Sequence, residues 1–341
     1  MEIFRAAFYK SGLYHLKPKK SAAVVFILFG FGFVYGFKKK YDHIQRQSQI
    51  KKSNIDENVP EPEIQPQPQP QPQPKPPSRI QLVDIKKSEL LEQIYNETLR
   101  ARDVPEEFKP FIGDQKGQDY LLEEYGLNNQ QVKQQLQTLL NGMRRARGDG
   151  NCFYTSFGFQ YLRHMFTKAS DQQFEEFIKM IQSLPFSVIH SEQLYEQNEE
   201  MCQKFLNYCE YLRTVELEQR EQEFLRLFSN PEEQFYGLCI IFLRNLIYKF
   251  CFEDEETKNI FEAFDLDLQK QILTWEYDCE NNQSVINILT RKLHIDIILY
   301  FIDEDSRKLQ VQEYKIGNAQ TLLEIHIIFR PGHYNVAIPN Q

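Results

Sequence analysis

Residues 147–157, "RGDGNCFYTSF", decide the interpretation of this chain, because a cysteine lies there between a Gly-Asp-Gly turn and an apolar run. Apolar residues at 153, 157, 161, 162 and 165 have helical spacing, so we predict a helix over residues 152–166. Cys152 then lies in its first turn, where the helix N-terminus favours an anion and should lower the thiol pKa. Gly148 and Gly150 allow a tight turn that directs backbone N–H groups inward, as an oxyanion hole requires.

A thiolate nucleophile needs a base, and a histidine is the usual one. The chain contains seven: His15, His43, His164, His190, His294, His326 and His333. His333 differs from the others because it follows Gly332 at a turn and precedes Asn335 by two residues. Residues i and i+2 of a strand face the same side, so His333 and Asn335 would be neighbours. This predicts a Cys–His–Asn arrangement, although by spacing alone a structural role for these residues stays equally open.

The pattern around this motif predicts an α+β fold. Helices are expected at 88–98 and 132–147, and residues 170–280 look almost entirely helical, with breaks at Pro185 and Pro231. Short β-branched segments at 294–303, 322–329 and 334–339 indicate strands, the last two forming a hairpin around "RPG". The layout is a small sheet packed against helices, with a long helical insertion.

The charge of the chain is unevenly distributed. The 341 residues carry a net charge of −8, but residues 1–55 contain 11 Lys and Arg against 2 Asp and Glu, which leaves −17 for the remainder. Nucleic-acid-binding proteins need a basic face, so the acidic body argues against that class and suits a partner with a basic face. The apolar content of 41% is enough to build a sizeable core.

The N-terminal part predicts a membrane anchor. After a basic segment, 1–20, residues 21–37 ("SAAVVFILFGFGFVYGF") carry no charge and have lysines close to both ends. A helix of this length spans about 25 Å, at the short end of what crosses a bilayer. A buried core helix and a cleaved signal peptide are the alternatives, which the flanking lysines and the missing small-residue cleavage site disfavour. Five Lys and Arg precede the segment and six follow it by residue 52, so charge gives no orientation.

A linker follows at 38–81, first basic and then rich in Pro and Gln. Residues 60–77 contain nine prolines, which predicts a polyproline II spacer about 55 Å long, with a ligand for an SH3-type domain as the alternative. The globular pattern begins near residue 82, so we expect one domain over 82–341.

The six cysteines form no C-x-x-C pair and do not cluster with histidines at zinc spacing. A disulfide framework is not expected where sparse cysteines lie in apolar segments of a chain this long. We expect a reducing compartment and structural thiols, with Cys152 as the exception.

Together, "RGDGNCFYTSFGFQYL" (147–162) and "RPGHYN" (330–335) resemble the ovarian-tumour (OTU) family of cysteine-type ubiquitin hydrolases, and more narrowly the otubains. The similarity extends through "CIIFLRNLIYKFCFEDEETKNIFEAF" (239–264) and "INILTRKLHIDIILYFID" (286–303) and covers the chain from about residue 82 to its end. The anchor and the linker fall outside it.

The resemblance implies a papain-like OTU fold with a small sheet between helices and a ubiquitin-binding helical arm over 170–280. It also implies that Cys152 is the nucleophile, that His333 is the general base, and that the amides of Asp149 and Cys152 serve the oxyanion hole. Otubains usually carry Asp where this chain has Asn335, and an asparagine can also orient an imidazole. No metal or cofactor is implied.

The expected function is that of a membrane-anchored deubiquitinase, which hydrolyses isopeptide bonds of ubiquitin conjugates through an acyl-thioester on Cys152. Its expected partners are ubiquitin, polyubiquitin chains and ubiquitin-conjugating enzymes. Because ubiquitin occurs in cytosol and nucleus, we expect a single-pass protein whose catalytic domain faces the cytosol. A non-catalytic adaptor that binds ubiquitin or a ubiquitin-conjugating enzyme is the alternative, and a purely structural thiol is the third.

Overall fold

The computed structural model describes residues 82, 85–125, 129–303, 308–317 and 321–340. The basic segment 1–20, the predicted anchor 21–37 and the linker 38–81 lie outside the described residues. The described elements follow one another as α3 (Glu89–Glu97), η3 (Glu106–Phe108), β1 (Ile112–Gly117), α4 (Gln118–Glu124), α5 (Gln130–Leu139), β2 (Leu140–Ala146), α6 (Cys152–Thr167), α7 (Asp171–Gln182), β3 (Val188–His190), β4 (Gln193–Tyr195), α8 (Glu199–Thr214), α9 (Leu217–Ser229), α10 (Phe235–Glu253), α11 (Glu255–Ala263), α12 (Leu268–Leu273), α13 (Asn282–Leu293), β5 (Asp296–Asp303), β6 (Lys308–Tyr314), β7 (Glu324–Arg330) and β8 (His333–Pro339).

The larger sheet has six strands in the order β1-β2-β8-β7-β5-β6. The strands pair antiparallel except β5 and β7, which are parallel. On β5, Ile297 and Leu299 belong to the main core, whereas Ile298 and Tyr300 belong to a second, smaller one. This alternation follows the two-residue period of a strand. Burial on both faces explains why the segment is an unbroken apolar run.

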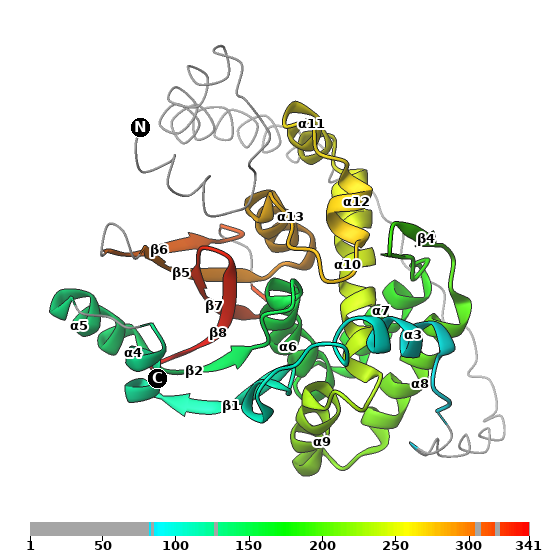
Figure 1. Cartoon of the computed structure of the whole chain (residues 1–341), viewed down its shortest axis with the longest axis horizontal. Helices are drawn as coiled ribbons and strands as arrows, with labels where there is room; N and C mark the ends of the chain where they lie inside the picture. Colours follow the sequence, from blue (N-terminus) through cyan, green and yellow to red (C-terminus); the bar gives the residue numbers. More distant parts are fainter. Residues whose placement is uncertain (1–81, 83–84, 126–128, 304–307, 318–320, 341) are drawn as a thin grey trace, which may run out of the picture. The chain divides into compact units, whose positions relative to one another are not determined.

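The two cores lie on opposite faces of the sheet. Figure 1 shows α4 and α5 on one side and α6 and α13 on the other. Helix α10 lies in the main core, and 14 of its 19 residues are buried. In the described part of the chain it alone is long and apolar enough to cross a membrane, but 78% of the apolar window is buried inside the protein, which is typical of a core helix.

The α+β prediction is confirmed. The helix predicted at 152–166 is α6, and the strands predicted at 294–303, 322–329 and 334–339 are β5, β7 and β8. Strands β7 and β8 form the expected hairpin, with Phe329 opposite Tyr334.

Two local predictions are wrong. Residues 132–147 do not form one helix, because α5 ends at Leu139 and the chain continues as β2. Gly142 faces Gly117 on β1, and a Cβ there would lie 2.0 Å from the carbonyl oxygen of Lys116, so this glycine permits a close strand approach that a helical pattern hides. Residues 170–280 are mainly helical, and α7 and α9 end just before Pro185 and Pro231, as predicted. The prediction fails at 188–195, where the chain forms the hairpin of β3 and β4, so that His190 is the last residue of β3 and not part of a helix.

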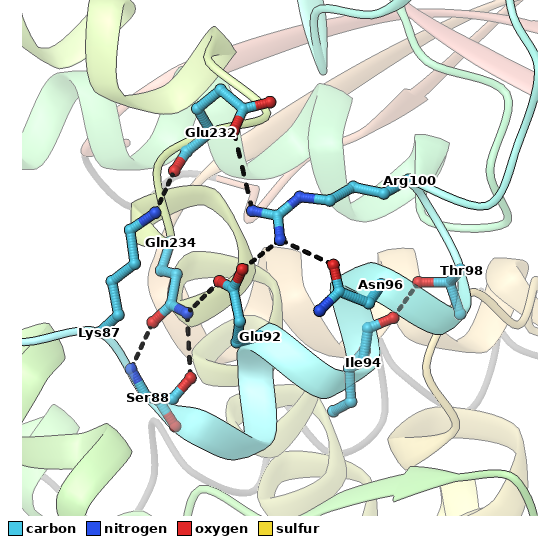
Figure 2. Close-up of polar contacts among 9 residues, drawn as sticks. All are labelled: Lys87, Ser88, Glu92, Ile94, Asn96, Thr98, Arg100, Glu232 and Gln234. Carbon is cyan, nitrogen blue, oxygen red and sulfur yellow. Dashed lines mark hydrogen bonds and ion pairs between the residues drawn. The ribbon is translucent and has the colours of Figure 1, made fainter.

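A polar network fastens α3 to the start of α10 (Figure 2). The Ser88 N–H donates to Gln234 Oε1 at 2.6 Å, and Gln234 Nε2 donates to the Ser88 carbonyl at 3.0 Å and to Glu92 at 3.1 Å. Arg100 holds the same Glu92 carboxylate and the Asn96 side chain. Further along the chain, the N–H of Gly237 donates to the Tyr95 hydroxyl at 2.8 Å. The N-terminal end of α10 is therefore held against α3 by hydrogen bonds to Ser88, Glu92 and Tyr95.

Candidate active site

Cys152 is the first residue of α6, and only 2% of its surface is exposed. The backbone N–H groups of Phe153 and Tyr334 face its thiol. Tyr334 is the second residue of β8, so the fold brings the start of α6 against the strand that carries His333 and Asn335. The predicted helix start and the predicted strand thus meet at the thiol.

The predicted lowering of the Cys152 pKa is wrong for this arrangement. Burial raises the pKa of the thiol to about 12, and the carboxyl groups of Asp278 and Asp149 act in the same direction. The amides of Tyr334 and Phe153 oppose the shift without overcoming it. Desolvation therefore outweighs the helix N-terminus, and the thiol is neutral at pH 7.

His333 and Asn335 are neighbours on one face of β8, as predicted. His333 Nε2 lies 3.1 Å from Asn335 Oδ1, which also accepts the backbone N–H of Ala146 at 2.8 Å. A backbone N–H can only donate, so the Asn335 atom facing it must be the oxygen. His333 Nε2 must then carry the proton, and Nδ1 holds the free lone pair. Asn335 is 0% exposed, and its Nδ2 donates to the Tyr125 hydroxyl at 2.8 Å.

The imidazole of His333 is neutral as well. Burial lowers its pKa to about 4, and the charges of Arg330 and Arg145 add to this, while Asn335 and the Ala146 backbone oppose it. No hydrogen bond joins Cys152 and His333 within the part of the chain that the structure describes. His333 directly precedes Tyr334, whose N–H faces the Cys152 thiol, but the two side chains are not an ion pair in this arrangement.

Asp149 lies in the turn before the nucleophile and is 4% exposed. Its Oδ1 accepts the N–H of Asn151 at 2.9 Å, and its own N–H donates to the Arg147 carbonyl at 3.1 Å. That amide is engaged inside the turn, so its use by an oxyanion requires the turn to change. Burial raises the pKa of the Asp149 carboxyl.

The loop between α12 and α13 closes over this turn. Gly150 has φ +82°, and a Cβ there would lie 2.0 Å from the carbonyl oxygen of Glu276, so only glycine fits. The Glu276 carboxylate pairs with Arg102, yet burial and the nearby Asp149 raise its pKa to about 7. Asp278, two residues on, accepts from Asn282 at 3.0 Å, and burial raises its pKa too.

Four residues near the site were not expected from the sequence: Tyr125, Arg244, Glu276 and Asp278. For Arg244 a signal existed, because it interrupts the apolar run "CIIFLRNLIYKF" of α10. For the other three, no local pattern distinguishes them from surface residues. Among the described residues, no group of three His, Cys, Asp or Glu side chains could hold a metal ion.

Several known proteins are similar to this chain in sequence or in fold. Residues 105–339 match the family model described as Peptidase C65 Otubain. The mouse protein named ubiquitin thioesterase OTUB2 is 23% identical over 210 residues, which are 60% of this chain and 83% of that protein. An Arabidopsis thaliana protein, ovarian tumor domain-containing deubiquitinating enzyme 1, is 39% identical over 59 residues, 16% of this chain and only 19% of its own length.

The fold is similar to that of a solved h/ceOTUB1 structure, in complex with ubiquitin aldehyde and UBCH5B~Ub. The TM-score is 0.51 at 18% identity, covering 74% of this chain and 96% of the other. A second complex of h/ceOTUB1, with ubiquitin aldehyde and UBC13~Ub, also has a TM-score of 0.51, at 17% identity. The match of the family model to well over half of the chain decides the classification: this chain belongs to the otubain family, peptidase family C65.

Proposed function

We propose that this chain is a membrane-anchored deubiquitinase that hydrolyses the isopeptide bond after the C-terminal glycine of ubiquitin. The observation that carries the proposal is the contact between α6 and β8. It places the Cys152 thiol beside the backbone of Tyr334, the residue between His333 and Asn335 in the sequence. The 3.1 Å contact of His333 with Asn335 supplies an oriented base in the same site. Family membership adds the substrate class, because the relatives carry the names ubiquitin thioesterase and deubiquitinating enzyme.

In the proposed reaction, His333 Nδ1 takes the thiol proton and the Cys152 sulfur attacks the carbonyl carbon of the ubiquitin C-terminal glycine. The tetrahedral oxyanion draws on N–H groups at the start of α6, with Asp149 contributing its amide once the turn has changed. Collapse expels the lysine amine, which takes the proton from the imidazolium, and leaves an acyl-thioester. A water molecule, deprotonated by His333, then releases ubiquitin and restores the thiol.

Because the thiol and the imidazole are both neutral, the thiol proton has to be removed when the substrate binds. A thiol pKa of about 12 leaves almost no thiolate at pH 7, so attack requires His333 to act as a general base or the pair to move closer together. Active-site hydrogen bonds that are absent without substrate often form in the complex. We therefore infer that binding of ubiquitin aligns His333 with Cys152.

The anchor and the partners belong to the same proposal. Residues 21–37 tether the protein, the linker 38–81 separates the anchor from the domain, and the domain faces the cytosol, where ubiquitin occurs. Helices of the 170–280 region form the docking arm for ubiquitin, and the acidic body of the chain suits a partner with a basic face. The h/ceOTUB1 complexes contain UBCH5B or UBC13 charged with ubiquitin, which makes ubiquitin-conjugating enzymes candidate partners here.

A panel of diubiquitins of all linkages tests this function. The full-length chain is expected to convert at least one of them to monoubiquitin, and Cys152→Ala none. A folded wild-type chain that cleaves no linkage would refute the proposal, and the linkage that is cleaved fastest would define the specificity.

A second function, a non-catalytic adaptor for ubiquitin or a ubiquitin-conjugating enzyme, is favoured by one observation. The thiol is buried and makes no hydrogen bond to His333 within the described residues. Binding of ubiquitin without cleavage of any diubiquitin would support this alternative.

A further inference from the structure

Arg244 lies in the middle of α10 and is 1% exposed, although it carries a charge. Its guanidinium donates to two segments that lie far apart in sequence. Toward the nucleophile turn it reaches Asn151 Oδ1 at 2.7 Å and the Gly150 carbonyl at 3.4 Å. Toward the loop after α12 it reaches the carbonyls of Ile272 at 2.7 Å and Tyr277 at 2.9 Å. The Gly150–Asn151 turn and the 272–277 loop form the two walls of the site, and one buried cation therefore joins them.

The contact with Asn151 changes how α6 begins. Asn151 is the N-cap residue of α6, and an asparagine there normally accepts a first-turn N–H of its own helix. Here its side chain makes no such cap, because Oδ1 is taken by Arg244. Its Nδ2 is buried and finds no partner among the described residues, so Arg244 alone fixes this side chain. The first amides of α6, including the Phe153 N–H that faces the thiol, are left uncapped.

The loop after α12 carries two of the acidic groups of the site. Tyr277 lies between Glu276, whose backbone packs on Gly150, and Asp278, whose carboxyl group acts on the thiol. The guanidinium also lies 3.9 Å above the Tyr154 ring and so is held by a stacking contact. A lysine side chain has a single ammonium group, so it cannot donate to these four acceptors in the way the planar guanidinium does.

We propose that Arg244 is a positioning residue for the nucleophile. It holds the Gly150–Asn151 turn against the 272–277 loop and keeps the Asn151 side chain away from the amides that serve Cys152. Loss of the fork lets the two walls separate and lets Asn151 cap its own helix. The inference rests on the proposed function for its catalytic consequence, but the opening of the site can be measured without ubiquitin.

The test compares Arg244→Lys with a matched control, Arg220→Lys, in the full-length chain. Arg220 also donates to three carbonyls, of Phe166, Arg213 and Val215, but near the far end of α6, about 21 Å along its axis from Cys152. Iodoacetamide labelling, followed by peptide mass spectrometry, gives the alkylation rate of each cysteine. Cys209, which is 0% exposed in α8, serves as the internal reference for global unfolding.

For Arg244→Lys we expect the alkylation rate of Cys152 to rise about tenfold or more relative to that of Cys209. This is the size of effect expected when one hydrogen bond to a charged group is lost. Turnover of a ubiquitin substrate should fall at least about tenfold in kcat, with KM little changed. Arg220→Lys should leave the ratio of Cys152 to Cys209 at its wild-type value. An unchanged ratio in Arg244→Lys, or an equal rise at both cysteines, would overturn the inference.

If Arg244→Lys does not fold, Asn151→Ala decides the question, because it removes one acceptor and leaves the guanidinium in place. It should raise the same ratio, and a wild-type ratio in this variant would overturn the inference. If the wild-type chain hydrolyses no ubiquitin conjugate, the proposed function fails, whereas the alkylation ratio still judges the role of Arg244.

Discussion

Replacing Asn335 with alanine removes three hydrogen-bond contacts from a fully buried position. The Ala146 N–H, His333 Nε2 and the Tyr125 hydroxyl lose their partner, at 2.8, 3.1 and 2.8 Å respectively. Leaving a buried polar group unsatisfied costs about 1–3 kcal/mol, so we expect a loss of roughly 3 kcal/mol or more in unfolding free energy. Turnover should fall about tenfold to a thousandfold, less than in His333→Ala, because the base remains but is no longer oriented.

Asn335→Asp should keep most of the activity. Both N–H donors can still donate to a carboxylate, and the Tyr125 hydroxyl, which now accepts from Asn335, can turn and donate instead. The new charge favours the imidazolium and should raise the pKa of His333 from about 4 by about one to three units. The acidic limb of kcat/KM then moves to higher pH by the same amount.

The assay is turnover of a ubiquitin–fluorophore substrate between about pH 3.5 and 9, which includes the wild-type limb near pH 4, with urea unfolding as the check on folding. Tyr125→Phe is the matched control, because it removes the hydroxyl and leaves the His333–Asn335 contact intact. Wild-type activity in Asn335→Ala would refute the orienting role. A folded but inactive Asn335→Asp, together with an inactive Tyr125→Phe, would show that the donor from Asn335 to Tyr125 is what the site requires.

Three further predictions follow from the site and the domain layout. Cys152→Ala should abolish hydrolysis at a cost of about 1 kcal/mol or less in stability, since the thiol is small although buried, and retained cleavage by this variant would exclude Cys152 as the nucleophile. Deletion of residues 1–80 should leave a soluble, active domain, while the full-length chain should resist carbonate extraction from membranes; an inactive truncation, or release by carbonate, would contradict the domain layout or the anchor. The pKa of His333 is about 4 in the folded chain, against an ordinary 6.5, so as the pH falls the imidazole of the unfolded chain is protonated first. The free energy of unfolding should therefore fall by about 3 kcal/mol as the pH drops from 6.5 to 4. His333→Gln should lack this component in urea titrations over the same pH window, and an identical pH dependence would show that His333 is not buried as described.

The side-chain periods of strands and helices, read from the sequence, were enough to predict the elements on which the proposed nucleophile and base lie. The i, i+2 rule brought His333 and Asn335 together, and the apolar spacing after Cys152 predicted α6. Strand β2 was not predictable in this way, because its residues 140–146 continue the apolar spacing of α5 and were predicted as helix, and only the pairing with β1 makes Gly142 necessary.

The electrostatics of the site were the least predictable part. A helix N-terminus suggests a lowered thiol pKa, but the burial of Cys152 and the approach of Asp278 are tertiary effects that reverse the direction. Asp278 and Glu276 come from a loop more than a hundred residues away, and nothing in their local sequence marks them. The arginine within the apolar run of α10 was visible in the sequence, since a charged residue in a core helix must find buried partners.

The most direct test of the central claim is a ubiquitin probe with an electrophile at its C-terminus, incubated with the full-length chain and analysed by peptide mass spectrometry. The account predicts one covalent adduct, on Cys152, which is absent in Cys152→Ala and strongly slowed in His333→Ala. A folded wild-type chain that binds the probe without forming an adduct, or forms it on another cysteine, would contradict it.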